Sequence, residues 1–201
     1  MYGYHSLLRD ASFLASLLDL DREVCEQVRA GACACGGPLH LATYPRKPRG
    51  VIRSFETAFS RRLSLCCGSE GCRKRVTPPS VCFLGRRAYL GVAFVLLSML
   101  RHGITSERER QLRRELHAEF PVDDRTLRRW RAWWCRHLPA TPFWRVAKGL
   151  LKESSAIVDL PGSLLEKFAG DAGCRLKSAL QFLSPLSTSS SRFGSGFSMV
   201  A

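Results

Sequence analysis

Five cysteines in two groups are the residues of this chain best suited to chemistry. Cys33 and Cys35 form the first group, and Cys66, Cys67 and Cys72 form the second, about thirty residues later. Thiolates are soft ligands, and a tetrahedral zinc site usually takes them as two close pairs that a hairpin brings together. Glycines follow or lie within each group, and they suit the sharp turns that such a site needs. The pattern predicts a zinc site.

The spacing leaves one ligand open, because five cysteines compete for four places. The predicted ligands are Cys33, Cys35, Cys67 and Cys72, with Cys66 as the alternative to Cys67. Neighbouring residues in a strand point to opposite faces, so Cys66 and Cys67 are not expected to bind the same ion. His5 and His40 are alternative ligands that no spacing favours. A group of reduced, buried cysteines without a metal is the other interpretation.

The positive charge of the chain is concentrated in its middle. The net charge is +14, residues 1–30 carry a net of −2, and residues 31–152 carry a net of +16. Such a local excess attracts a polyanion, most often a nucleic acid. A solvated basic face without a partner is the alternative.

The number of cysteines, the start of the chain and the length of its apolar runs together predict where in the cell the protein is located. Nine cysteines are an odd number, and the start of the chain does not resemble a signal peptide. We therefore expect metal-bound thiolates in a reducing cytoplasm. The longest apolar run, over residues 88–100, is shorter than the roughly twenty residues that a membrane span needs, so we expect no membrane anchor.

The elements that would position the cysteines are a helix and a few strands. Leucines near a 3.6-residue period predict an amphipathic helix over residues 6–30, with Asp19 or Asp21 as a possible break. Strands are predicted over residues 39–44, 63–66 and 73–76, and Pro78-Pro79 ends this zinc ribbon. Two basic clusters in it suit phosphate contacts: Arg46, Lys47 and Arg49, then Arg73, Lys74 and Arg75.

Residues 86–138 are predicted to form three helices. The third begins at an aspartate cap and continues through residues 124–134. At 100° per residue, Leu127, Trp130 and Trp134 share one face, and an arginine-rich face lies opposite. These features are typical of a helix-turn-helix recognition helix. The residues predicted to contact DNA from it are Arg125, Thr126, Arg128, Arg129 and Arg136. A structural helix with a solvated arginine face is the alternative.

The predicted fold is therefore mainly α with a small β zinc ribbon. It has an N-terminal helix (1–30), a zinc ribbon (31–80), a helix-turn-helix domain (86–152), short C-terminal helices (153–185) and a disordered tail (186–201). The tail is predicted from its Ser, Thr and Gly content.

Several stretches resemble one group of small bacterial proteins described as transposase-like. They are residues 44–50, the second cysteine group with Arg73-Lys74-Arg75, residues 77–81 and 83–87, and later residues 126–134 and 142–144. The resemblance covers roughly residues 30–185. It implies a zinc ribbon and a helix-turn-helix in a DNA-binding protein linked to mobile elements. Cys82 stands where the group leads us to expect arginine, so we do not expect it to be a ligand.

No catalytic constellation accompanies these motifs. A complete transposase of the usual kind needs three carboxylates on a sheet to hold two metal ions, and the sequence after the ribbon predicts helices instead. We find no nucleophile triad or phosphate-binding loop either. The sequence thus predicts a non-catalytic protein that binds duplex DNA. The alternatives are an accessory or remnant subunit that acts with a catalytic transposase, and an RNA-binding zinc-ribbon protein. The oligomeric state is not predicted.

Overall fold

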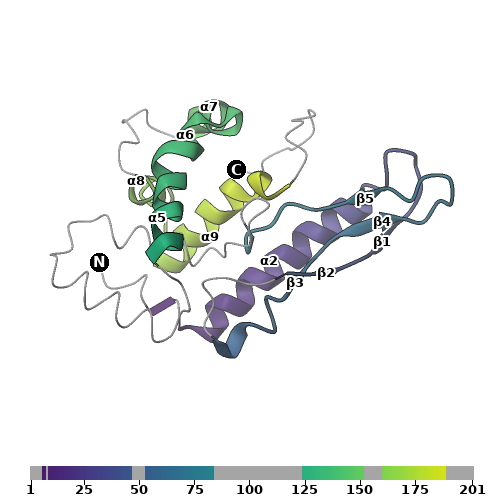
Figure 1. Ribbon diagram of the computed structural model, residues 1–201, viewed down its shortest axis with the longest axis horizontal. Helices are drawn as coiled ribbons and strands as arrows, with labels where there is room; N and C mark the ends of the chain where they lie inside the picture. Colours follow the sequence, from purple (N-terminus) through teal and green to yellow (C-terminus); the bar gives the residue numbers. More distant parts are fainter. Residues whose placement is uncertain (1–5, 8, 47–52, 84–123, 152–159, 189–201) are drawn as a thin grey trace, which may run out of the picture.

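The computed structural model describes residues 6–7, 9–46, 53–83, 124–151 and 160–188 of the 201-residue chain (Figure 1). Two predicted helices within residues 86–120, and residues 189–201 of the predicted tail, lie outside the described residues. The described chain combines helices with two small antiparallel sheets, so the fold is mixed α and β.

The long helix α2 (Ala11–Ala30) contributes side chains to both apolar clusters of the described residues. Its first residue is fixed by Asp10, whose carboxylate accepts hydrogen bonds from the backbone N–H groups of Ser12 and Phe13 at 2.8 and 3.2 Å. An aspartate in this position satisfies N–H groups that the first helical turn leaves without partners. The predicted N-terminal helix is therefore confirmed from residue 11 onward.

The possible break of this helix at Asp19 or Asp21 does not occur. Asp19 lies on the surface, where it pairs with Arg22 at 2.5 Å. Asp21 is only 4% exposed and accepts hydrogen bonds from Ser80 Oγ and from the backbone N–H of Val81. Both aspartates are thus satisfied without interrupting the helix.

The short strands form two sheets. In the first, β1 (Leu39–Leu41) pairs with β4 (Leu65–Cys67), which also pairs with β5 (Arg75–Val76). In the second, β2 (Tyr44–Pro45) pairs with β3 (Arg61–Arg62). A 3-10 turn, η1 (Arg53–Phe55), precedes β3. We call residues 33–76 the strand module; it lies along α2 in Figure 1. The three predicted strand regions are confirmed, although each strand is shorter than predicted.

The remaining described helices form what we call the helical module, residues 124–188. Its elements are α5 (Asp124–Ala132), the π-turn η2 (Trp133–His137), α6 (Leu138–Ala140), α7 (Pro142–Ala147), η3 (Lys148–Leu150), α8 (Gly162–Leu165), α9 (Ala172–Leu183) and η4 (Ser184–Ser187). Trp130, Trp134 and Leu138 are buried at four-residue intervals, so α5, η2 and α6 present one apolar side to the core. Trp144 is buried too, and its ring contacts Phe182 of α9.

Among the described residues, two apolar clusters form the core, and α2 contributes to both. Near its N-terminal half, Phe13, Leu14 and Leu17 belong to the same apolar cluster as the buried tryptophans of the helical module. Near its C-terminal end, Cys25 belongs to one cluster with the inner side chains of β1 and β4. The helical module gathers beside the N-terminal half of α2, while the strands extend toward its other end (Figure 1). The described part of the chain therefore has two cores on one shared helix.

A buried polar network joins the two modules. Arg62, only 3% exposed, donates to the carbonyl of Pro78 at 2.5 Å and to Ser187 Oγ at 3.3 Å. Ser187 Oγ also accepts from the N–H of Ser80, whose own hydroxyl donates to Asp21. Burial raises the pKa of Asp21, while these hydrogen bonds and the nearby charge of Arg62 act in the opposite direction. Ser187 is thus buried and ordered, which corrects the predicted start of the disordered tail at residue 186.

Candidate metal centre

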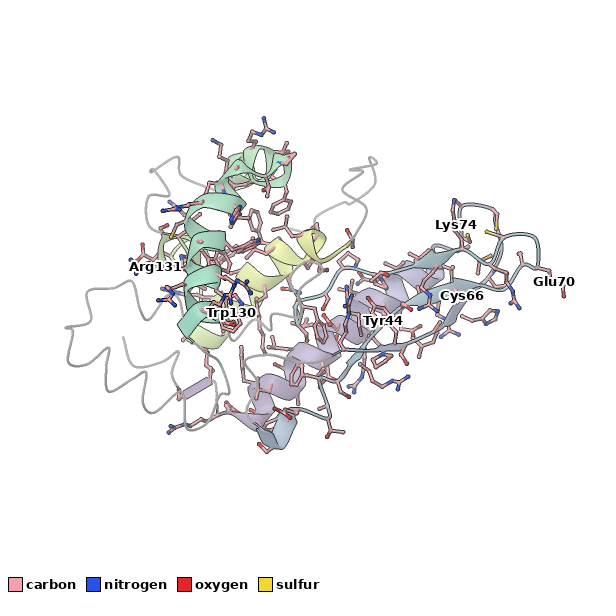
Figure 2. All side chains as sticks on the ribbon, in the orientation of Figure 1. Tyr44, Cys66, Glu70, Lys74, Trp130 and Arg131 are labelled. Atoms are coloured by element: carbon pink, nitrogen blue, oxygen red, sulfur yellow. The ribbon has the colours of Figure 1, made fainter. Side chains whose placement is uncertain are left out.

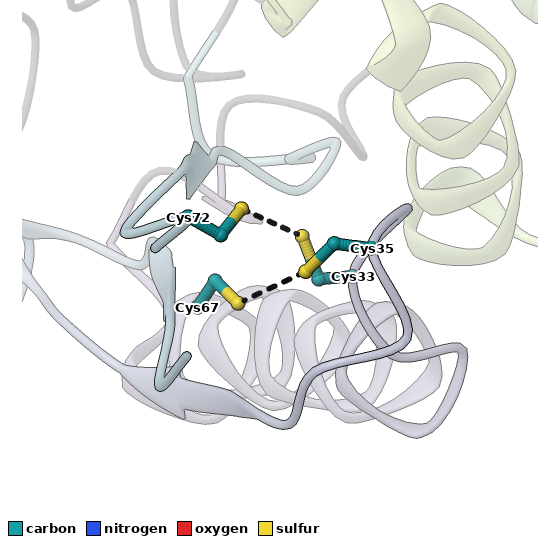
Figure 3. A group of neighbouring side chains, drawn as sticks. All are labelled: Cys33, Cys35, Cys67 and Cys72. Carbon is teal, nitrogen blue, oxygen red and sulfur yellow. Dashed lines mark hydrogen bonds between the residues drawn. The ribbon is translucent and has the colours of Figure 1, made fainter. Parts of the chain in front are cut away.

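The ends of α2 and of the β1–β4 hairpin bring four cysteines together. Cys33 and Cys35 follow the last residue of α2, Cys67 is the last residue of β4, and Cys72 lies in the turn before β5. Leu39 of β1 is the strand partner of Cys67 in β4. Because Cys33 and Cys35 directly precede β1, this antiparallel pairing brings Cys67 close to them. All four Sγ atoms lie within 4.8 Å of one another (Figure 3).

The sulfur positions fit a tetrahedral ion. Cys33 Sγ and Cys72 Sγ are 3.8 Å apart, and Cys35 Sγ and Cys67 Sγ are 3.5 Å apart. A zinc–sulfur bond of about 2.3 Å gives a tetrahedron whose sulfur–sulfur edge is roughly 3.8 Å. No disulfide links any of the nine cysteines. The predicted set of Cys33, Cys35, Cys67 and Cys72 is therefore the set that the fold assembles.

Cys66 is not part of this group. Its Sγ lies 3.7 Å from the carbonyl of Cys67 and 3.6 Å from the carbonyl of Arg73, and its strand partner in β1 is His40. Cys66 and Cys67 alternate across β4, so only one of them faces the cluster. His40 is exposed and likewise does not belong to the group. Cys82 is buried elsewhere, with its thiol near the carbonyl of Leu17.

Two glycines shape the turn that carries the first pair. The N–H of Gly36 donates to the carbonyl of Cys33 at 2.7 Å, and Gly36 has a φ of +80°, which L side chains rarely adopt. Gly37 packs directly on the second pair, because a Cβ built there would lie 2.9 Å from Cys67 Sγ and 2.1 Å from Ser69 Oγ. Gly37 therefore leaves room for Cys67 to reach the cluster.

Backbone hydrogen bonds hold the second turn and join it to the first. The N–H groups of Cys72 and Arg73 both donate to the carbonyl of Ser69, at 3.0 and 3.1 Å. Arg73 has a φ of +47°, in the left-handed region. The N–H of Gly68 donates to the carbonyl of Pro38 at 2.8 Å, which ties the two turns to each other. The cysteine positions are thus fixed by backbone geometry as well as by packing.

The thiols influence one another strongly. The N–H of Gly37 and then the neighbouring thiols lower the pKa of Cys35 to about 6. For Cys72 the N–H of Lys74 acts to lower the pKa, but the contacts with Cys35 and the other thiols, together with burial, raise it to about 11. One thiolate is therefore easily formed, whereas further thiolates in the same small space repel one another. A bound cation removes that repulsion, which is why such a group suits a metal.

The ligand chemistry narrows the choice of metal. Four sulfur ligands in a tetrahedral arrangement favour zinc or an iron–sulfur centre over the hard ions magnesium and calcium. Cys33 and Cys67 are buried, with Leu39 and Leu65 beside them, and Cys35 is exposed. The site therefore has buried apolar side chains on one side and is accessible to solvent at Cys35.

The residues predicted to contact DNA fall into two separate regions. In the strand module Arg73, Lys74 and Arg75 are exposed and Arg46 is partly exposed, while Lys47 and Arg49 lie outside the described residues. In the helical module Arg125, Arg128, Arg129 and Arg136 are exposed. In Figure 2 Lys74 and Arg131 lie at opposite ends of the molecule. The two regions therefore present separate basic surfaces.

Two details of the third predicted helix differ from the prediction. Thr126 is only 6% exposed, so it lies on the packed side of α5 and is not placed to contact DNA. The π-turn η2 adds the equivalent of one residue to the helix, which rotates the later residues by about 100°. Arg136 is exposed but lies inside η2, whose turn is wider than that of α5, so it is not related to Arg125, Arg128 and Arg129 by regular α-helical spacing.

Tyr44 and Arg61 were not among the residues predicted to contact DNA, although both lie close to residues that were. Arg61 donates to Thr43 Oγ1, and the ring of Tyr44 is flanked by Arg46 and Arg75. The available signal was the Arg61-Arg62 pair in a short strand, where one arginine faces inward and the other outward.

No protein family, curated protein or solved structure was found to match the chain. None of the helices in the described ranges combines the length and the apolar character that crossing a bilayer requires.

Proposed function

We propose that this chain is a zinc-stabilised DNA-binding protein that is not catalytic on its own. The observation that carries the proposal is the two-sided character of α5. Arg125, Arg128 and Arg129 are exposed, while Thr126 and Trp130 on the other side are buried. Arginine side chains held by a well-packed helix are suited to bidentate bonds with guanine edges or phosphates.

Zinc is the proposed metal, because four Sγ atoms within 4.8 Å of one another fit a single tetrahedral ion in a closed, structural zinc site. In this interpretation the strand module is a zinc ribbon, and Cys33, Cys35, Cys67 and Cys72 hold the ion. The ion supplies stability rather than chemistry, since all four of its positions are taken by protein ligands.

A helix-turn-helix is the proposed context of α5. In such a motif the second helix enters the major groove, and its first residues contact base edges. The early positions of Arg125, Arg128 and Arg129 in α5 agree with that role. The link to mobile elements, and a catalytic transposase subunit as a partner, come from the resemblance of residues 30–185 to transposase-like proteins.

Binding of the zinc-loaded protein to random duplex DNA, single-stranded DNA and RNA over a salt series tests this function. We expect duplex binding whose logarithmic affinity falls linearly with the logarithm of salt concentration. Arg128→Ala with Arg129→Ala should weaken that binding while metal content and helicity stay unchanged, since both side chains are exposed. A preference for single-stranded RNA would favour the RNA-binding alternative, and no binding at low salt would contradict the proposal.

A further inference from the structure

Two arginines from different segments lie beside Tyr44 on the strand module. The guanidinium carbon of Arg46 lies 5.0 Å from the centre of the Tyr44 ring, and that of Arg75 lies 6.0 Å from it. Arg61 bonds to Thr43 Oγ1 and pairs with Pro45, so it lies on the opposite face of the two-stranded sheet. We call Tyr44, Arg46 and Arg75 the Tyr44 cluster. Figure 2 shows Tyr44 partway along the strand module, nearer to the helical module than Cys66 is.

The sheet pairing holds these side chains in place. Pro45 of β2 pairs with Arg61 of β3, and the N–H of Arg46 donates to the carbonyl of Ser60 at 2.6 Å. Arg75 is placed by β5, where it is the strand partner of Cys66. Segments distant in sequence are thus fixed as neighbours, and the aromatic ring of Tyr44 restricts the side chains of Arg46 and Arg75. Such restriction reduces the entropy that binding a ligand would otherwise cost.

The cluster gathers positive charge without a matching negative charge. Within the described ranges, neither Arg46 nor Arg75 forms an ion pair, whereas Arg22 and Arg29 of α2 pair with Asp19 and Glu26. Arg62 is buried nearby, and its charge is balanced by the buried carboxylate of Asp21, each favouring the charged form of the other. The charges of Arg46 and Arg75 remain available to an external anion.

We propose that the Tyr44 cluster is a binding site for a backbone phosphate of duplex DNA, separate from the α5 surface. The proposal rests on the DNA-binding function proposed above. A phosphodiester offers several acceptor oxygens around one negative centre, which suits guanidinium groups arriving from different directions. Tyr44 is a positioning residue here, because its ring orients Arg46 and Arg75 and need not touch the DNA.

The first test compares two pairs of substitutions that remove the same charge. Arg46→Gln with Arg75→Gln alters the cluster, and Arg22→Gln with Arg29→Gln alters exposed arginines of α2 that already pair with carboxylates. Duplex DNA binding is measured over a salt series with zinc-loaded, full-length protein. For the cluster pair we expect a salt dependence less steep by about 0.9 for each phosphate that the protein no longer neutralises. The α2 pair should leave the slope close to that of the wild type.

The second test removes the ring without changing the charge. Tyr44→Leu should weaken duplex binding in the same direction as the arginine pair, whereas Tyr44→Phe, which keeps the ring, should bind like the wild type. Zinc content and circular dichroism establish that each variant is folded. A folded Tyr44→Leu protein that binds as tightly as the Phe variant would show that the ring does not position the arginines, and would overturn the proposed site.

The remaining outcomes separate this inference from the proposed function. If the wild type binds duplex DNA and both arginine pairs weaken it equally, the cluster is only part of a diffuse field and the inference is wrong, although the function stands. If the wild type does not bind duplex DNA, the function itself fails. If the cluster pair weakens binding of inorganic phosphate, measured by calorimetry, but leaves duplex binding and its salt slope unchanged, the site takes the free anion, and its assignment to DNA is wrong.

Discussion

The strand module and the helical module share α2 but are stabilised in different ways. Among the described residues, the core beside the helical module contains twenty-one buried side chains, including Trp130, Trp134 and Trp144. The core of the strand module contains five, of which Cys25, Cys33 and Cys67 are cysteines. A core that small contributes little hydrophobic stability. The comparison predicts that the strand module depends on a metal held by its four cysteines, whereas the helical module depends on apolar packing.

Removal of a metal ligand should have the largest effect on this comparison. We expect Cys35→Ser to reduce bound zinc from one equivalent to none and to unfold the strand module, because metal binding and folding are coupled in small metal sites. Metal content by atomic spectroscopy and circular dichroism measure the two effects. Cys66→Ser is the matched control, since Cys66 precedes the ligand Cys67 but faces away from the cluster. Full zinc content in Cys35→Ser would rule out its role as a ligand.

A core substitution in the helical module should give the converse result. Trp134→Ala is expected to lower the free energy of unfolding by about 3–5 kcal/mol, because it leaves a large cavity among buried side chains. Chemical denaturation measures this loss. Trp133→Ala should cost less, since Trp133 is only partly buried. Both proteins should keep one equivalent of zinc; loss of zinc from Trp134→Ala would mean that the two cores are not independent.

A glycine substitution tests how closely the two cysteine turns pack. Gly37→Ala places a methyl group against Cys67 Sγ, so zinc affinity should fall on the order of tenfold or more, as it does when groups that support metal ligands are changed. Competition with a chelator of known affinity measures the change. Gly71→Ala is the control, because a Cβ there meets no atom within 4 Å. Equal affinities for the two variants would contradict the packing described above.

The polar junction between the modules should give the smallest effect. Asp21→Asn replaces an acceptor of the Ser80 hydroxyl by an amide that also donates, and it removes the charge opposite Arg62. We expect the free energy of unfolding to fall by about 1–3 kcal/mol, as for a broken buried hydrogen bond. Asp19→Asn makes the same change on the exposed side of α2 and should cost less than about 1 kcal/mol. Thermal and urea unfolding measure both, and indistinguishable variants would show that the network does not join the modules.

The sequence predicted the parts of this fold that depend on local patterns. The cysteine groups, the amphipathic period of α2 and the alternation of β1 and β4 each leave a local signature. The helix and the strands are confirmed, and the four predicted cysteines lie together in a group that could hold a metal ion. The choice between Cys66 and Cys67 followed from register, because only the pairing of β4 with β1 decides which of them faces the cluster.

The remaining features depend on contacts between distant residues. Asp21, Arg62 and Ser187 look like surface residues in the sequence, and only the folded chain brings them into one buried network. The π-turn after α5 has no local marker in the sequence either, although it contains Trp134, and both Trp134 and Leu138 are buried. Thr126 is buried because it lies on the side of α5 that packs on the core. The arginines in the sequence predicted the exposed side of this helix, but they did not show on which side Thr126 would lie.

Hydrogen exchange of the zinc-loaded protein, with and without a strong chelator, tests the account most directly. Peptides covering residues 31–76 should lose protection when the chelator removes the metal, whereas peptides covering residues 124–151 and 160–188 should keep it. This result would show that four cysteines hold a metal on which only the strand module depends. Equal loss in both modules, or no loss in either, would contradict that claim.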